Sequence, residues 1–372
     1  MINIAFVIDA IESPTAGTEK QLLLLIRHLD RARFRPYLCV LRSSQWLNKE
    51  FGDCEVVDIG VSSWFRPASW LNLLRFSAFL RRKGIDIVQT HFVDGNKIGI
   101  LAAKLAGVKG IVSTRRNQGY WHSKNELLLL DILNRWVSRF LANSDSTRRW
   151  AAKAERIDIQ RIDVIHNALE LDRYQPVICR PPAGYMAEIG FPADAVVIGI
   201  VANLRRVKAI DVFLRAAAMV TGHCPAARFI VVGDGPERAA LEGLCRELGI
   251  GSVVRFMGSC LDIPAILAGM DIGVLSSSSE SFSNSILEYL AAGLPVVCTD
   301  VGGAREAVED GTNGYVVEPG DFASMADGIR KIMEGENLTK MGRQSREMAE
   351  RSFSLPCVMR LHEEFFQGVA LR

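Results

Sequence analysis

The fold is decided by one stretch in the second half of the chain, IGVLSSSSESFSNSILEYLAAGLPVVCT (residues 272–299). It begins with the short apolar run Ile272–Leu275, which is typical of a buried strand. A serine-rich loop follows, and Ser283 or Asn284 is expected to cap a helix. The apolar run Pro295–Cys298 then predicts the next strand. A strand, a helix and a second strand in this order form the unit from which parallel sheets are built.

The same alternation extends in both directions along the 372 residues. Other strands are predicted at Ile4–Ile8, Arg35–Leu41, Ile85–Thr90, Gly110–Thr114, Phe140–Ala142, Asp163–Ile165, Val196–Val201, Arg228–Val232, Val253–Met257 and Gly314–Val317. Helices are predicted at Glu19–Leu29, Trp70–Lys83, Asn96–Leu105, Ser144–Ala154, Ile210–Val220, Glu237–Leu248 and Asn284–Ala292. Strands joined by helical crossovers form parallel sheets covered on both faces, so the predicted class is α/β.

A break in this alternation separates two series of elements. Residues 175–194 contain four prolines and no long hydrophobic period, which is typical of a linker. We therefore predict two Rossmann-like domains, residues 1–174 and 195–354. Ligands of such folds bind beyond the carboxyl ends of the strands, so two domains facing each other across a cleft would place a site in that cleft.

Composition excludes several classes of protein. Apolar residues make up 49% and charged residues 23% of the chain, which is typical of a globular protein. The formal charge of +2 is unevenly distributed. Residues 1–170 contain 25 basic and 17 acidic residues, a net charge of +8, and the remaining residues have a net charge of −6. The basic half is expected to meet an anionic surface or ligand.

The sequence also predicts a location. No apolar run approaches the roughly 18 residues that a membrane helix needs. The chain opens directly into the predicted strand Ile4–Ile8, without the pattern of a signal peptide. The eight cysteines are scattered and form no Cys-x-x-Cys pair, which favours reduced thiols over disulfides or a zinc site. We therefore expect a cytoplasmic protein.

Two stretches of the second half are suited to binding an anion. Residues 201–211 run from a strand end into a helix and offer Arg205, Arg206 and Lys208 near the helix N-terminus, where a phosphate is the natural ligand. A solvated basic turn is an equally good interpretation of that stretch alone. Residues 231–238 contain a Gly-Asp-Gly-Pro turn whose glycines allow a close backbone approach, although a plain tight turn explains it as well.

Two carboxylates accompany these stretches. Glu280 lies in the loop before the predicted helix, and Glu288 lies about one turn inside it. Carboxylates accept hydrogen bonds from paired hydroxyl groups such as those of a ribose or a hexose. Glu288 could instead be a solvent-facing helix residue, but its apolar neighbours Ile286, Leu287 and Leu290 argue against that alternative.

Together these residues resemble the group 1 (family 4) glycosyltransferases of the GT-B fold. The resemblance covers essentially the whole chain and is carried by the following features: Lys208, Gly233-Asp-Gly-Pro236, Glu280-x7-Glu288, Pro295–Asp300, Gly302-Gly-x-x-Glu306, Asp310-Gly-x-x-Gly314 and Glu318-Pro-Gly-Asp321. It implies two Rossmann-like domains facing across a cleft. It also implies a C-terminal helix, residues 355–372, that crosses back and packs on the N-terminal domain.

The resemblance implies roles for individual residues. Lys208 would bind the diphosphate of a nucleotide-sugar donor, Glu288 the ribose hydroxyls, and Glu280 the hydroxyls of the donor sugar. The remaining donor-binding residues implied are Gly17, Asn203, Arg205, Gly233, Gly235, Ser283, Asn284, Ser285 and Ile286, of which the last four would cradle phosphates with backbone N–H groups. Family members often have Gly-Arg-Leu where this chain has Ala202-Asn-Leu204, so Arg205 or Arg206 is expected to replace the missing arginine.

The N-terminal half resembles the family more loosely. Gly17 matches a glycine-rich loop after the first strand, and His91 matches a cleft-facing histidine at a strand end. A core histidine is the less favoured alternative. Arg116 stands where many members have a histidine that contacts the donor sugar. We predict catalytic roles for Glu280, Lys208, His91 and Arg116, and an arginine at position 116 could also bind an acceptor phosphate or carboxylate.

The implied activity is that of a retaining glycosyltransferase that needs no metal and no cofactor. The donor would be a nucleotide-diphosphate sugar, by default a UDP-sugar, and the acceptor a glycan or polyprenyl-linked glycan of bacterial-type polysaccharide or glycoconjugate biosynthesis. The alternatives are a sugar-nucleotide epimerase or phosphorylase on the same fold and a non-catalytic sugar-nucleotide-binding subunit. No nucleic-acid partner is expected.

The basic half also raises the question of membrane contact. Residues 64–83 are rich in aromatic, leucine and basic residues. We favour a crossover helix that packs its apolar stripe on the sheet. The alternative is a basic amphipathic segment in peripheral contact with an anionic membrane, at the inner face of the plasma membrane.

Overall fold

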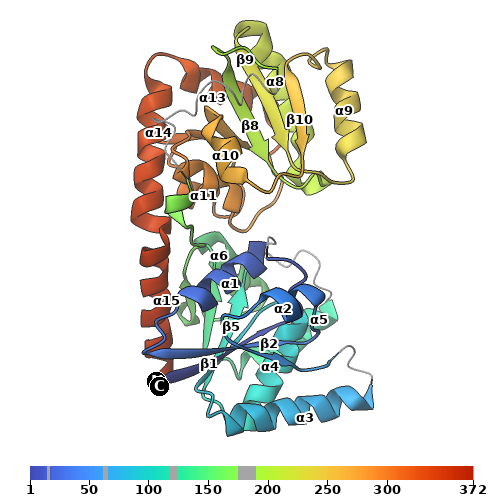
Figure 1. Cartoon of the computed structure of the whole chain (residues 1–372), viewed down its shortest axis with the longest axis vertical. Helices are drawn as coiled ribbons and strands as arrows, with labels where there is room; N and C mark the ends of the chain where they lie inside the picture. Colours follow the sequence, from blue (N-terminus) through green and yellow to red (C-terminus); the bar gives the residue numbers. More distant parts are fainter. Residues whose placement is uncertain (15–16, 62–65, 118–123, 175–189, 372) are drawn as a thin grey trace. The chain divides into compact units, whose positions relative to one another are not determined.

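The computed structural model describes residues 1–14, 17–61, 66–117, 124–174 and 190–371. It divides into two compact units (Figure 1). Unit 1 comprises Met1–Ala168 together with Pro356–Arg372, and unit 2 comprises Leu169–Leu355. Each unit has its own sheet of parallel strands, so the predicted α/β class with two Rossmann-like domains is confirmed.

The sheet of unit 1 has seven strands in the order β3-β2-β1-β4-β5-β6-β7. Their bounds are β1 (Ile2–Ile8), β2 (Phe34–Val40), β3 (Glu55–Asp58), β4 (Ile87–Thr90), β5 (Gly110–Arg115), β6 (Arg139–Ala142) and β7 (Ile162–Val164). The central strands are buried along most of their length because helices cover both faces. The strand order reverses between β1 and β4, which makes the carboxyl ends of these two strands the expected ligand-binding edge.

Among the described residues of unit 1, six α-helices connect these strands, and one more comes from the end of the chain. They are α1 (Gly17–His28), α2 (Gln45–Glu50), α3 (Pro67–Arg82), α4 (Val93–Ala106), α5 (Lys124–Asn134), α6 (Asp145–Ala154) and α15 (Leu355–Ala370). On α15, the fully buried Phe366 packs edge-on against Phe6 and Phe34, with ring centroids 6.0 and 6.2 Å apart. The buried face of α15 therefore belongs to the core of unit 1.

The sheet of unit 2 has six strands in the order β10-β9-β8-β11-β12-β13. Their bounds are β8 (Val196–Val201), β9 (Ala227–Val232), β10 (Val254–Gly258), β11 (Ile272–Leu275), β12 (Val296–Thr299) and β13 (Gly314–Val317). The helices are α8 (Ile210–His223), α9 (Arg238–Glu247), α10 (Ile263–Ala268), α11 (Asn284–Ala291), α12 (Ala304–Ala307), α13 (Phe322–Met333) and α14 (Asn337–Met348). Two hydrophobic clusters form the core of this unit. The strand order reverses between β8 and β11.

The chain passes from unit 1 to unit 2 between Ala168 and Leu169, ahead of the expected linker. Leu169 lies beside the end of unit 2, because its N–H donates to the carbonyl of Phe353 and its own carbonyl accepts from the N–H of Leu355, both at 2.9 Å. Residues 169–174 therefore belong to unit 2. Most of the predicted linker, residues 175–189, lies outside the described residues.

Candidate active site

In unit 2 the first anion-suited stretch, residues 201–211, lies beside the serine-rich loop that follows Leu275. These two segments follow β8 and β11, the two strands at which the strand order reverses. The hydroxyl of Ser276 donates to the carbonyl of Lys208 at 2.8 Å, and the N–H of Ser278 donates to the carbonyl of Val207, also at 2.8 Å. Hydrogen bonds thus join residues 205–208 to the serine-rich loop, as the switch-point rule predicts.

Lys208 and Glu280 form an ion pair in this region. The Nζ atom of Lys208 lies 2.5 Å from Oε1 of Glu280, which also accepts a hydrogen bond from Ser277 at 2.8 Å. The two charged side chains are 24% and 15% exposed, so they are shielded but still open to a ligand. An ammonium group has three donors, so Lys208 could bind a second anionic group while it keeps Glu280.

A third loop, which follows β12, packs against the loop that carries Glu280. Gly302 has a positive φ of 57°, and a Cβ atom at this position would lie 2.4 Å from the carbonyl oxygen of Glu280. The N–H of Gly303 donates to the carbonyl of Ser281 at 2.8 Å. Glycine at position 302 is therefore required by close backbone packing against the loop that carries Glu280.

The N-terminus of α11 lies at the same edge of the sheet. Its cap residue, Ser283, has an extended backbone and makes no capping hydrogen bond with its side chain. Ser285 donates its hydroxyl to the carbonyl of Val201 at 2.7 Å, which ties the first turn of α11 to the end of β8. Ser283 and Ile286 are buried, so their backbone N–H groups rather than their side chains are suited to an anion.

Glu288 is buried and not a solvent-facing helix residue. It is 8% exposed, and the hydroxyl of Tyr174 donates a hydrogen bond to its carboxylate. Burial raises the pKa of Tyr174, and the neighbouring carboxylate raises it further. The guanidinium of Arg346 bridges the carbonyls of Tyr174 and Ala291 at 3.0 and 2.5 Å, so the segment with Tyr174 is held against α11.

The other predicted donor residues of unit 2 surround the loop after β8. Gly233 and Gly235 pack against it. A Cβ atom on Gly233 would lie 2.0 Å from the carbonyl oxygen of Ala202, and one on Gly235 would lie 2.5 Å from that of Leu204. These two glycines are thus needed for loop-to-loop packing. Asn203 and Arg205 are exposed on the same loop, and so is Arg206.

The remaining predicted residues belong to unit 1. Gly17 begins α1, and the residues before it, 15 and 16, lie outside the described part of the chain. Arg116 follows β5 and is half-buried. It donates to Oδ1 of Asn167, and burial lowers its pKa to about 10, although the nearby Glu19 opposes this shift.

His91, which the sequence predicted to face a cleft, is buried within unit 1. It is 1% exposed, and its ring nitrogens lie 3.1 Å from Nε2 of Gln89 and 3.2 Å from Oγ1 of Thr114. Burial lowers its pKa to about 3, helped by the charge of Arg116 and by His362. The ring is therefore neutral near pH 7. His362, which α15 brings from the far end of the chain, is one of the groups whose charge acts on His91.

A cavity opens at the carboxyl ends of β4 and β5. Within the described part of unit 1, it is lined by residues from four segments: Thr18, Phe92, Val93, Asn96, Thr114, Arg115, Arg116, Asn117 and Leu130. Phe92 has a φ of 59° and a ψ of 175°, a combination that is nearly restricted to glycine and is found mainly at functional sites. This cavity is the place in unit 1 that is suited to a small polar ligand.

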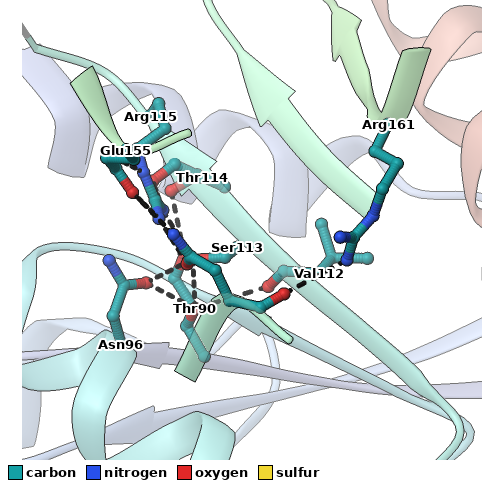
Figure 2. Close-up of polar contacts among 9 residues, drawn as sticks. Thr90, Asn96, Val112, Ser113, Thr114, Arg115, Glu155 and Arg161 are labelled. Carbon is teal, nitrogen blue, oxygen red and sulfur yellow. Dashed lines mark hydrogen bonds and ion pairs between the residues drawn. The ribbon is translucent and has the colours of Figure 1, made fainter. Parts of the chain in front are cut away.

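A buried polar network fixes the wall of this cavity (Figure 2). The guanidinium of Arg115 binds both carboxylate oxygens of Glu155 at 2.7 Å, and its third nitrogen donates to Ser113 at 2.6 Å. Both Thr90 and Ser113 donate to Oδ1 of Asn96, at 2.6 and 2.9 Å. Helices α4 and α6 are thereby tied to β4 and β5, next to Arg116.

Several residues of these sites were not found from the sequence. Tyr174 and His362 reach their partners only through tertiary contacts, and no local pattern marks them. Asn96 was placed at the start of a predicted helix without a role. Nothing in the sequence Thr90-His91-Phe92 indicates a strained backbone at Phe92, because glycine is the residue that normally adopts this conformation.

Comparison with known proteins places this geometry among sugar transferases. Residues 195–335 match the family model described as "Glycosyl transferases group 1", and residues 15–173 match the model described as "Glycosyltransferase Family 4". D-inositol 3-phosphate glycosyltransferase of Mycobacterium tuberculosis (strain H37Rv) is 34% identical over 204 residues, which are 53% of this chain and 41% of the relative. The matched region thus spans about two fifths of the length of this curated relative.

Solved structures extend the similarity to nearly the whole chain. Anabaena Alr3699/HepE in complex with UDP has a TM-score of 0.86 at 22% identity, over 99% of this chain and 100% of that one. Sucrose-phosphate synthase from Thermosynechococcus elongatus has a TM-score of 0.81 at 18% identity, over 99% of both chains. At such low identity these structures show that the GT-B fold is shared.

Proposed function

This chain belongs to the group 1 (family 4) glycosyltransferases, and we propose that it transfers a hexose from a nucleotide-diphosphate sugar to a glycan or lipid-linked acceptor with retention of anomeric configuration. The observation that carries the proposal is the convergence in unit 2 of the Lys208–Glu280 pair with the N-terminus of α11. A diphosphate needs a cation and N–H donors, and a sugar hydroxyl needs a carboxylate. The loops after β8 and β11, together with the first turn of α11, supply these groups.

The reaction would proceed as the resemblance implies. The bond between the anomeric carbon and the diphosphate oxygen breaks, and the acceptor oxygen bonds to that carbon on the same face. The departing phosphate oxygen takes the acceptor's proton, so no separate base is required. Lys208, an arginine (Arg205 or Arg206) and the N–H groups of α11 would stabilise the charge that develops on the leaving group. These charges would replace a metal ion.

A UDP-sugar is the proposed donor. The Anabaena protein has been solved with UDP and with UDP-glucose, and it shares the fold of this chain over nearly its whole length. In this chain Glu288 would accept from the two ribose hydroxyls, and Glu280 from hydroxyls of the donor sugar. The base itself is not specified by any residue discussed above, so the donor is the part of the proposal that a binding assay should test first.

Unit 1 would bind the acceptor. Its cavity offers Arg116 with Thr18, Asn96 and Thr114, a lining suited to a polar or anionic glycan. The proposed role is in polysaccharide or glycoconjugate biosynthesis of the bacterial type, with a polyprenyl-linked or other lipid-linked acceptor at the inner face of the plasma membrane. Because residues 1–170 carry a net charge of +8, we include peripheral contact with an anionic membrane in this proposal. Within the described residues, no helix is both long and apolar enough to span a bilayer.

A thermal-shift panel of UDP, GDP and ADP tests donor binding. Binding to the native state raises the unfolding temperature in proportion to occupancy, so the preferred nucleotide gives the largest rise. We expect UDP to do so and expect its effect to survive a chelator of divalent metals. Failure of all three nucleotides to stabilise the chain would refute the proposed donor site.

The chemical outcome needs a second assay. Incubation with UDP-sugars and a panel of glycan acceptors, followed by NMR of the product, is expected to show an anomeric configuration that matches the donor. Isomerised donor in the absence of acceptor would instead identify an epimerase. Donor binding without any product would identify a non-catalytic binding subunit.

A further inference from the structure

Helix α3 lies at the surface of unit 1, but its outer face is unlike that of most surface helices because it is partly apolar. Its inner face buries Leu73, Phe76 and Leu80, and the helix packs against α4. This agrees with the favoured prediction of a crossover helix. Figure 1 shows α3 at the outer edge of unit 1, so its other face points away from the core of that unit.

The outward face is apolar over its first two turns. Trp70, Leu71 and Leu74 are 52%, 50% and 57% exposed, which leaves most of three large side chains in contact with solvent. Their spacing of one, three and four residues places them on one side of the helix. Scattered exposed apolar residues are common, but a contiguous group with tryptophan indicates a contact surface.

The same face is cationic over its last two turns. Arg75 and Arg82 are exposed there, and α3 contains no acidic residue from Pro67 to Arg82. We name Trp70, Leu71, Leu74, Arg75 and Arg82 the α3 outer face. Arginines beside a tryptophan and leucines are the composition of a helix that lies in a membrane interface, with its charges on lipid phosphates and its apolar groups below them.

A second exposed apolar group, on α5, lacks this charge. Leu128, Leu129 and Ile132 are 65%, 40% and 47% exposed. Helix α5 contains Lys124, Glu126 and Asp131, which together carry no net positive charge, and Asp131 pairs at 3.7 Å with Arg135 just beyond the end of the helix. Charge therefore distinguishes the α3 outer face from α5 as a surface for an anionic partner.

We propose that the α3 outer face docks unit 1 on the surface of an anionic lipid bilayer. This deepens the membrane contact included in the proposed function and rests on it. The helix would lie flat, with Trp70, Leu71 and Leu74 at the level of the acyl boundary and the two arginines on lipid phosphates. Each basic residue near such a surface strengthens partitioning about fivefold.

A second copy of the chain is a poorer occupant for this face. A symmetric pair of α3 outer faces would bring the same patch of both copies together. Arginines of one copy would then lie near arginines of the other without an acid on α3 to compensate, and like charges at an interface are repulsive. An anionic bilayer satisfies the apolar and the cationic part of the face together.

The test is flotation of the full chain with vesicles of phosphatidylcholine, with and without phosphatidylglycerol. We expect flotation with the anionic vesicles at low salt and a decrease as salt rises. Trp70→Ser/Leu74→Ser and Arg75→Glu/Arg82→Glu are each expected to lower the bound fraction at least about fivefold. The matched control, Leu128→Ser/Ile132→Ser on α5, is expected to float like the wild type.

Two further measurements keep the outcomes separate. The rise in unfolding temperature with UDP shows whether each variant is folded and whether the donor site works, independently of flotation. Light scattering in the absence of lipid reports self-association. Absence of wild-type flotation, equal flotation of the α3 variants, or equal loss in the α5 control would overturn the proposal, and so would a wild-type dimer that the α3 variants dissociate.

Discussion

At the scale of single residues, the Lys208–Glu280 pair combines the charge and the carboxylate that the proposed reaction needs. Lys208→Ala is expected to weaken UDP binding about tenfold to a hundredfold, because it removes hydrogen bonds from a charged donor to the diphosphate. Glu280→Ala is expected to lower kcat about a hundredfold or more, with a smaller effect on UDP binding. Titration calorimetry with UDP and steady-state kinetics measure the two effects.

The double variant distinguishes a working pair from two independent residues. Because the two side chains touch at 2.5 Å, their effects on kcat/KM should depart from additivity by about 1 kcal/mol or more. Lys331→Ala is the matched control, because this exposed lysine forms an ion pair with Asp327 on the same helix, α13. Wild-type kinetics in both single variants would show that the site has been assigned wrongly.

Tyr174 is expected to position Glu288 without touching the donor. Tyr174→Phe keeps the buried ring and removes the hydroxyl that donates to the carboxylate. The Kd for UDP should rise about threefold to tenfold while kcat stays near the wild-type value, because one hydrogen bond to a charged group is lost from the ribose-binding residue. UDP titration measures the Kd, and steady-state kinetics measure kcat.

The control for this substitution is Tyr315→Phe on β13, which removes a hydroxyl outside the site. It should leave UDP affinity unchanged. If Tyr174→Phe also left the affinity unchanged, Glu288 would not depend on this contact. An equal fall in kcat and in stability would indicate a purely structural role.

At the scale of elements, the pair Arg115–Glu155 joins β5 to the end of α6 and is almost completely buried. Glu155→Gln is expected to reduce the free energy of unfolding of unit 1 by about 3 to 5 kcal/mol, because it leaves a buried guanidinium without its counter-charge. Urea unfolding followed by circular dichroism measures the change.

A partly exposed ion pair in the same sheet provides the comparison. Asp163→Asn breaks the contact with Arg139, whose side chain is 20% exposed, and should cost about 1 kcal/mol or less. Equal costs for the two substitutions would show that burial of the Arg115 network is not what determines its strength.

The elements that sequence patterns predicted are those whose pattern is local. Most strands at the centres of the two sheets contain an apolar run, since both of their faces are covered. Strand β3 was missed because it is short and lies at the edge of its sheet, with Glu55 and Asp58 exposed at its ends. Helices α13 and α14 were not assigned, although Asp321 gives a capping signal by accepting from the N–H of Ser324.

At the scale of the whole molecule, the stability of unit 1 should fall as the solution is acidified. Burial lowers the pKa values of His91 and His362 to about 3, so below about pH 6.5 the unfolded chain binds protons that the folded chain does not. Burial raises the pKa of Asp9 to about 6, which acts in the opposite direction, because the folded state then holds a proton that the unfolded state has released. Burial also raises the pKa of Glu19, which acts in the same direction as Asp9. The two histidines outweigh these carboxylates, and the net loss between pH 7 and pH 5 should be at most about 2 kcal/mol.

The urea midpoint at pH 5, 6 and 7 measures this dependence. In His362→Gln the dependence should be nearly abolished, since one histidine and Asp9 then roughly cancel. The quantity compared is the slope of the urea midpoint with pH. Loss of the His362 ring that stacks on Phe366 would lower stability equally at every pH and would not change this slope. An unchanged slope in the variant would mean that His362 can be protonated in the folded state.

Sequence alone determined what depends on local order and spacing in this protein. The class of fold, the family, and the positions of Glu280 and Glu288 on either side of one helix N-terminus all follow from runs, periods and motifs within short windows. Tertiary structure decided which side chains meet. Only the fold brings His362 of α15 near His91, places Tyr174 on Glu288, and buries Glu155 against Arg115. The physical reason is that burial and counter-charge come from neighbours in space, whereas a sequence pattern records only neighbours along the chain.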